Sequence, residues 1–188
     1  MITRLPETGW PAGLFARRDA MILTLAATGL TYTQIAARRI CDVTADPVAD
    51  ALHVDAVDRI AAIPPGLVAA GSSPTRVHRR RMEVLGFSDR YFSTHLLATC
   101  MDTGDGSELT GQDGRIDPAD RRPLLTPIDR WGHTPLTATP LTARAVADII
   151  AAHLSGQAPR HIRLPLRRST ENNSLTKQAT DIESLGDD

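Results

Sequence analysis

The chain is poor in several residue types, and each shortage excludes a class of protein. Two cysteines, Cys41 and Cys100, are too few for a disulfide framework or a cysteine-rich zinc site. Every apolar run stays below the roughly 20 residues that a membrane-spanning helix requires. The first residues also lack the charged and then apolar layout of a secretory signal. We therefore expect a cytoplasmic protein that does not enter a membrane.

Aromatic residues make up only 4% of the chain, so the core must be packed mainly by leucine, isoleucine, valine and alanine. All apolar residues together reach 41% of the 188 residues, which is enough for the core of one domain. Lysine is almost absent, since Lys177 is the only one, and arginine carries the rest of the positive charge. The planar guanidinium of arginine grips a phosphate with two hydrogen bonds.

The net charge of −1 is unevenly distributed along the chain. Residues 1–168 hold 20 arginines against 17 acids, whereas residues 169–188 hold one lysine against five acids. The second segment is rich in serine, threonine and asparagine, so it buries too little apolar surface to offset the entropy of ordering. We therefore divide the chain into a helical domain, 1–168, and a flexible acidic tail, 169–188.

Apolar spacing and capping residues predict a mainly α fold, a compact multi-helix domain with at most a short β-hairpin. Thr31 and Gln34 form a capping-box pattern, which starts a helix that is expected to run to about residue 40. Asp46 and Pro47 are suited to the N-cap and first turn of another helix, which ends before Pro64. The remaining helices are expected over 14–28, 73–85, 88–101 and 141–154.

Two segments between these helices are expected to be irregular or extended. Residues 102–121 are rich in glycine and aspartate and predict a long exposed loop. Prolines and threonines over 122–140 predict extended chain, which is where the short hairpin would form.

Two arginine-rich clusters contain no acid and are candidates for a phosphate-binding surface. The first consists of Arg76, His78, Arg79, Arg80 and Arg81, and the second of Arg160, His161, Arg163, Arg167 and Arg168. Such clusters bind the backbone of nucleic acids, although a solvated helix face or chain end has the same composition.

Two longer stretches share their residue order with a known family. Residues 17–43 contain Ala27-Thr-Gly-Leu30, then Arg39 and Asp42-Val43, after an apolar helix. Residues 123–132 end in Asp129-Arg-Trp-Gly132 and are followed by the predicted helix that carries Arg144. In this order and spacing, both stretches resemble the catalytic domain of tyrosine recombinases, the phage-integrase family. The resemblance implies a recombinase-like helical fold and DNA as the partner.

The residues that this family uses for catalysis are replaced. The first catalytic arginine of the family follows Gly-Leu, where this chain has Thr31, and the acid three residues later is Gln34. The nucleophilic tyrosine of the family lies near the C-terminus, but Tyr32 and Tyr91 both precede the second matching stretch. A neutral hydroxyl cannot replace a guanidinium that stabilises the charge on a scissile phosphate. We therefore expect a truncated, degenerate relative that is not an enzyme.

The expected function is that of a catalytically inactive DNA-binding protein, a regulator or accessory factor of a mobile element. It would associate with the nucleoid and need no cofactor. The arginines expected to contact double-stranded DNA are Arg76, Arg79, Arg80, Arg81, Arg144, Arg160, Arg163, Arg167 and Arg168. The alternative is a protein–protein interaction module that binds another protein, or a second copy of itself, through its helical surface and acidic tail.

Other patterns are weaker. Residues 29–52 resemble a helix-turn-helix, but the acids Asp46 and Asp50 on its second helix would repel phosphate. Residues 109–120 resemble the second half of an EF-hand loop, yet Leu109 and Gly111 stand where the first calcium ligands would be. The six histidines show no metal-binding spacing, so we expect no metal site. Cys41 is more typical of a small core residue than of a nucleophile.

Overall fold

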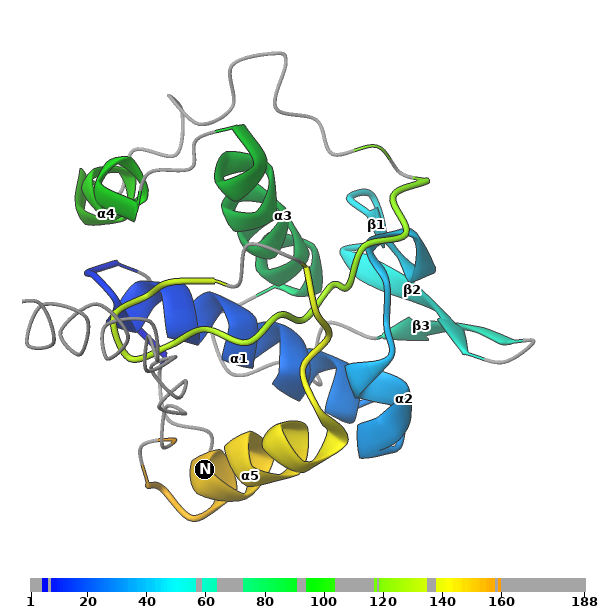
Figure 1. Ribbon diagram of the computed structural model, residues 1–188. Helices are drawn as coiled ribbons and strands as arrows, with labels where there is room; N and C mark the ends of the chain where they lie inside the picture. Colours follow the sequence, from blue (N-terminus) through cyan, green and yellow to red (C-terminus); the bar gives the residue numbers. More distant parts are fainter. Residues whose placement is uncertain are drawn as a thin grey trace, which may run out of the picture.

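The computed structural model describes residues 5–6, 8–56, 59–63, 73–90, 94–103, 117, 119–134, 138–157 and 159. This part of the chain is a helical domain with a short antiparallel sheet (Figure 1). The helices are α1 (Ala12–Ala26), α2 (Tyr32–Ala36), α3 (Pro74–Arg90), α4 (Thr94–Thr103) and α5 (Ala143–Leu154). A 3-10 turn, η1 (Ile40–Asp42), leads into strands β1 (Val43–Asp46), β2 (Ala51–Ala56) and β3 (Arg59–Ile63).

Helix α1 lies at the centre of the core, between α3 on one side and α5 on the other (Figure 1). Its apolar run supplies Met21, Ile22 and Leu25, which are fully buried and pack with residues of α2, the sheet, α3 and α5. A second, smaller cluster joins Leu14 and Phe15 of α1 to α3, α4 and Ile128. The helix predicted over 14–28 is therefore confirmed, with its start and its end each two residues earlier.

The capping box at the start of α2 is also confirmed. The backbone N–H of Gln34 donates to Oγ1 of Thr31, and the Gln34 side chain accepts from the backbone N–H of Thr31 at 2.9 Å. Gly29 (φ +80°) makes the turn between α1 and α2 in a backbone conformation that favours glycine. Helix α2 ends at Ala36, earlier than predicted, because the chain from Arg38 onward pairs with an extended segment instead.

The helix expected from Asp46 is wrong, and strands occupy its place. The strands form an antiparallel sheet in the order β1-β2-β3, with Val43 opposite Val54 and Leu52 opposite Ile63. Leu52 and Val54 are buried, whereas His53 between them and Asp55 after them are not, so the apolar period over 52–55 is two and not 3.6. The strands also remove the second helix of the proposed helix-turn-helix. The sheet is thus larger than the single hairpin expected, and it lies outside 122–140.

Asp46 caps a turn where a helix was predicted. Its Oδ1 accepts hydrogen bonds from the backbone N–H groups of Val48 and Ala49, which closes the connection between β1 and β2. Asp50 then adopts a positive φ of 47°, a conformation that ends any helical path. Aspartate followed by proline starts turns as readily as helices, and here the turn is favoured.

The later helices differ from prediction at their ends. Helix α3 continues through Gly86 to Arg90, because Phe87 is buried in the smaller cluster and holds the last turns against α1. The hydroxyl of Ser88 donates to the carbonyl of Val84 within this helix, so it does not cap a new one. Helix α4 starts at Thr94, and α5 matches its prediction closely. The predicted tail, 169–188, and most of the predicted loop, 102–121, lie outside the described residues.

The segment 119–134 crosses the domain in extended form, as predicted for its later part. Leu124 and Leu125 are fully buried in the main core, and the backbone N–H of Leu141 donates to the carbonyl of Leu125 at 2.8 Å. Within the described residues, no helix has both the length and the apolarity to cross a membrane.

We predict that Thr31→Ala lowers the free energy of unfolding by about 1 kcal/mol, since it leaves the first amides of α2 without their side-chain acceptor. Urea unfolding followed by circular dichroism measures this. Thr33→Ala is the matched control, because Thr33 is exposed on the same helix. Equal destabilisation by the two substitutions would show that the capping box does not stabilise α2.

Candidate nucleic-acid interface

Helix α3 carries the first of the two predicted arginine clusters, and its four arginines differ in exposure. The side chain of Arg79 is 67% exposed and lies 3.8 Å from Glu83, one turn along the helix. Arg76 and Arg80 are half-buried. Arg81 is fully buried: its Nε donates to the carbonyl of Leu124 at 2.9 Å and its Nη2 to Oγ1 of Thr126 at 3.1 Å. Arg81 therefore does not belong to the exposed edge expected from this cluster.

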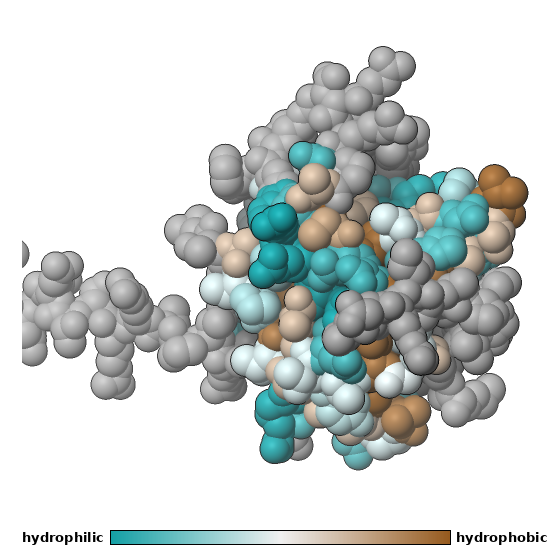
Figure 2. All heavy atoms as spheres, turned by 90° about the vertical axis from the view of Figure 1, so that its right-hand side faces the viewer, coloured by the Kyte–Doolittle hydropathy of each residue, from teal (hydrophilic) through white to brown (hydrophobic). Residues whose placement is uncertain are grey.

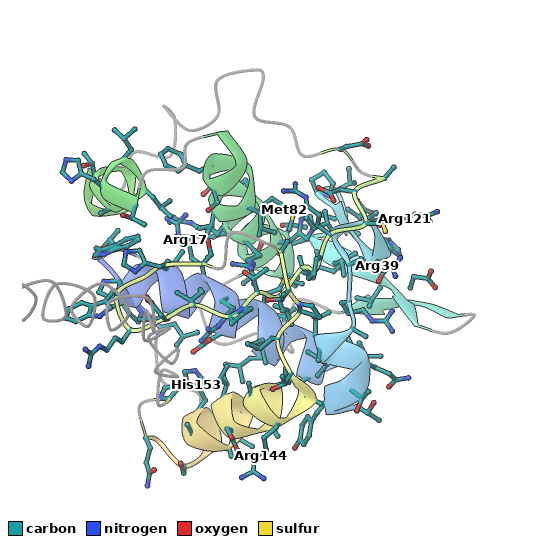
Figure 3. All side chains as sticks on the ribbon, in the orientation of Figure 1. Arg17, Arg39, Met82, Arg121, Arg144 and His153 are labelled. Atoms are coloured by element: carbon teal, nitrogen blue, oxygen red, sulfur yellow. The ribbon has the colours of Figure 1, made fainter. Side chains whose placement is uncertain are left out.

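Of the other predicted contacts, the structure describes Arg144, which does not extend this edge. Arg144 is exposed near the start of α5, where its Nε donates to Asp148 at 3.0 Å. Figure 3 shows it on α5, well away from α3. The predicted contacts Arg160, Arg163, Arg167 and Arg168 lie outside the described residues.

A buried cluster of charges lies under α3, centred on Asp19 of α1. Arg18 donates to Oδ1 of Asp19 from both Nε (2.9 Å) and Nη2 (2.8 Å). Nε2 of His153, from α5, lies 3.1 Å from the other oxygen of the same carboxylate. Beside this group, Nη1 of Arg17 donates to Glu83 of α3 at 3.2 Å. The cluster therefore links α1 to both of the helices that flank it.

Burial explains the electrostatics of this cluster. The pKa of Arg81 falls to about 9, first because burial disfavours its charge and then because Arg18 is near, while Asp19 opposes the shift. The side chains of Arg18, Asp19 and His153 are each at most 6% exposed. They cannot reach a ligand outside the protein, so this cluster is structural.

A signal for this burial is present in the sequence. Arg18, Met21, Ile22 and Leu25 lie three or four residues apart, on one face of a helix whose apolar members are all in the core. An arginine that continues an apolar helical stripe is expected to point inward with a carboxylate beside it.

Two further exposed arginines, Arg39 and Arg121, lie on neighbouring segments of the structure. Neither is among the DNA contacts expected from the sequence. Residues 38–41 run antiparallel to 120–124: the N–H of Ile40 donates to the carbonyl of Arg122 (3.0 Å), and the N–H of Leu124 to that of Arg38 (2.9 Å). The bridge between Arg39 and Pro123 is isolated: Ile40–Asp42 form η1, and the N–H of Cys41 donates to the carbonyl of Asp120 (2.9 Å), so the regular pairing ends before Arg121. Figure 3 shows Arg39 and Arg121 at the same end of the molecule, where the sheet lies, and the charge of Arg121 acts on Cys41, two residues from Arg39.

The two remaining arginines of the strand pair have partners within the protein. Nε of Arg38 donates to the carbonyl of Gln34 at 3.0 Å. Nε of Arg122 donates to Oδ2 of Asp120 at 2.8 Å, and this contact lowers the pKa of Asp120. Within the part of the chain that the structure describes, no carboxylate lies within ion-pair distance of the guanidinium of Arg39 or Arg121. We call Arg39 and Arg121 the arginine pair.

Cys41 lies beside the arginine pair but is not activated by it. Burial first, and then a 3.5 Å contact of the thiol with Asp42, raise its pKa, although the charge of Arg121 opposes both. The thiol therefore stays protonated at neutral pH, which disfavours a role as a nucleophile.

Helix α3 packs beside β1 and β2, which follow Arg39 and Cys41 in the chain. His78 makes a hydrogen bond with the backbone of Val43, at the start of β1, and its pKa is lowered by burial. A short hydrogen bond joins Thr75 to Asp50 at the start of β2. Hydrophilic side chains form a band down the side of the molecule that carries the sheet and α2 (Figure 2). Among the described residues, no group of histidine, cysteine and acidic side chains could hold a metal ion.

We predict that Asp19→Asn destabilises the protein by about 3–5 kcal/mol, because it removes the carboxylate that offsets the buried charge of Arg18. Asp148→Asn is the matched control: it breaks an exposed pair on α5 and should cost less than about 1 kcal/mol. Urea unfolding of both variants provides the comparison. A loss at Asp19 no larger than the loss at Asp148 would contradict a central structural role for this carboxylate.

The chain was also compared with known proteins. No protein-family model, no curated protein and no solved structure matches it.

Proposed function

We propose that this protein binds double-stranded DNA without cleaving it, and that the arginine pair contacts the phosphate backbone. The observation that carries the proposal is the placement of two exposed arginines on two segments that backbone hydrogen bonds join, with no carboxylate among the described residues paired to either. Backbone hydrogen bonds hold the two positions at a fixed spacing, so less ordering is needed when a ligand binds. Arginine at such a position offers two parallel donors to a phosphate.

Electrostatics favours phosphate over other ligands of this face. The carboxylate of Asp42 accepts the backbone N–H of Arg39 at 2.8 Å, and Asp120 is held by Arg122, so both nearby acids have partners. Among the described residues, the exposed Arg79 of α3 has one ion-pair contact, a long one of 3.8 Å with Glu83, and an ion pair with so exposed a partner contributes little. It can turn toward a phosphate at small cost, which adds a further contact from the helix beside β1.

Thr31 stands at the position where tyrosine recombinases have their first catalytic arginine, and this replacement favours binding without cleavage. Thr31 and Gln34 satisfy each other in the capping box of α2, and neither presents a positive charge to a ligand. A chain with this arrangement retains no arginine at that point to stabilise a phosphoryl transition state. The proposed role is that of a regulator or accessory factor of a mobile element.

The exposed apolar residues favour DNA over a protein partner. Among the described residues, the large ones are Tyr32, Val48, Leu96, Trp131 and Leu154. They belong to five different segments: α2, the β1–β2 turn, α4, the extended chain and the end of α5. A stable protein interface is built around a contiguous cluster of such residues, and single exposed ones are common on any surface.

We predict that the double variant Arg39→Ala/Arg121→Ala binds a mixed-sequence duplex more weakly and with a shallower dependence on salt. Each phosphate contact contributes about 0.9 to the slope of log affinity against log salt, so the slope should fall by about 2. Fluorescence anisotropy of a labelled duplex, titrated at several salt concentrations, measures it.

Arg144→Ala is the matched control for charge. It removes an exposed arginine from a different face, and that arginine already contacts Asp148. The control should change the salt slope by much less than one contact. An equal loss of slope per arginine removed would show that binding follows the overall charge, and wild-type protein that fails to bind at low salt would refute the proposal.

A further inference from the structure

Residues 129–133 form a tightly held loop in the extended chain, away from the arginine pair. Oδ1 of Asp129 accepts the backbone N–H groups of Trp131 and His133, both at 2.8 Å, and its Oδ2 lies 3.1 Å from Nδ1 of His133. The backbone N–H of Asp129 donates to the carbonyl of His133 at 2.9 Å. These bonds fix Trp131 and His133 relative to Asp129.

The loop is also fixed to the core. Gly132 has a φ of +85°, and a Cβ placed on it would lie 2.2 Å from Cζ2 of Trp10. The indole ring of Trp10 therefore packs directly on the backbone of Gly132, which only glycine permits. Trp10 in turn packs against the smaller apolar cluster, and Ile128, just before the loop, is a buried member of it. Such a loop presents its outer side chains in one arrangement.

Two of these side chains stack on each other at the surface. The guanidinium of Arg130 lies 4.6 Å from the centroid of the Trp131 ring. Trp131 is 60% exposed, and Arg130 and His133 are exposed as well. Asp129 has both carboxylate oxygens engaged within the loop, so positive charge dominates the outer surface of the loop.

We propose that Arg130 and Trp131 form a stacking site for an unpaired nucleotide of a single-stranded nucleic acid. The flat indole offers a face on which any base can stack, and a guanidinium stacked beside it adds a positive charge for the adjoining phosphate. A duplex keeps its bases stacked inside and cannot use the indole in this way. The site goes beyond the proposed duplex binding and does not depend on it.

The charge of the loop argues for a nucleotide rather than a peptide. A hydrophobic peptide would have to cover a guanidinium that no carboxylate within the described residues neutralises. A nucleotide supplies both the aromatic base and the anionic phosphate that this pair of side chains complements.

The test uses the full-length chain and two labelled probes of equal length, a 12-nucleotide oligothymidine and a mixed-sequence duplex. Trp131→Leu should weaken binding of the single strand about tenfold, since one stacking contact is lost. Trp131→Phe, which keeps an aromatic face, should lose only part of this. Duplex binding should be the same for wild type and Trp131→Leu. Because Trp131 is mainly exposed, both variants should unfold at the same urea concentration as wild type.

Tyr32→Leu is the matched control, because Tyr32 is the other described aromatic residue with an exposed side chain, on α2. It should leave single-strand binding unchanged. Three results would overturn the proposal: no binding of the single strand by wild type, equal affinity of wild type and Trp131→Leu, or equal weakening for the duplex. If Trp131→Leu does not fold, Arg130→Ala replaces it in the test. Arg130→Ala should weaken binding of the single strand and leave binding of the duplex unchanged.

Discussion

The buried carboxylate of Asp19 and the Arg17–Glu83 pair beside it link the three long helices of the domain. The carboxylate lies on the central helix, accepts two hydrogen bonds from Arg18 and meets His153 of α5, all inside the core. Arg17 and Glu83 make a parallel link between α1 and α3. Burial of these charges is unfavourable unless each has a partner, so the helices can pack only where the partners meet. The apolar residues around them supply most of the stabilisation, and the charges fix the geometry.

The two candidate surfaces depend on this core in different ways. The arginine pair is fixed by the strand pair of 38–41 with 120–124, and Leu124 continues from that pair into the main core. The loop at 129–133 is fixed by Asp129 and by the contact of Trp10 with Gly132. Figure 3 places the arginine pair at the end of the molecule that carries the sheet, whereas Trp10 and the loop adjoin the start of α1. The extended segment 119–134 therefore carries one exposed arginine, Arg121, near the sheet and another, Arg130, near the start of α1.

Much of the fold follows from local sequence, but the site does not. Helices α1 and α5 and the capping box of α2 were predictable, because their apolar stripes and caps involve residues only a few positions apart. The strands were missed because Asp46-Pro47 fits a helix start, although the alternation of Leu52 and Val54 was visible. Val77, Arg81 and Val84 share one helix face, which could have shown that Arg81 points inward. Arg39 and Arg121 are far apart in the sequence and lie near each other only because their segments are joined by backbone hydrogen bonds. A local sequence pattern cannot predict which distant segments will pair.

The most direct test of the central claim is to follow the arginine side chains by NMR as a DNA duplex is added. In a protein labelled with nitrogen-15, the Nε–H signals of Arg39 and Arg121 should shift together with the amide signals of residues 40–42, because a phosphate bound there changes their surroundings. The signal of Arg144 should stay in place. Shifts centred on α5, with Arg39 and Arg121 unchanged, would contradict the account.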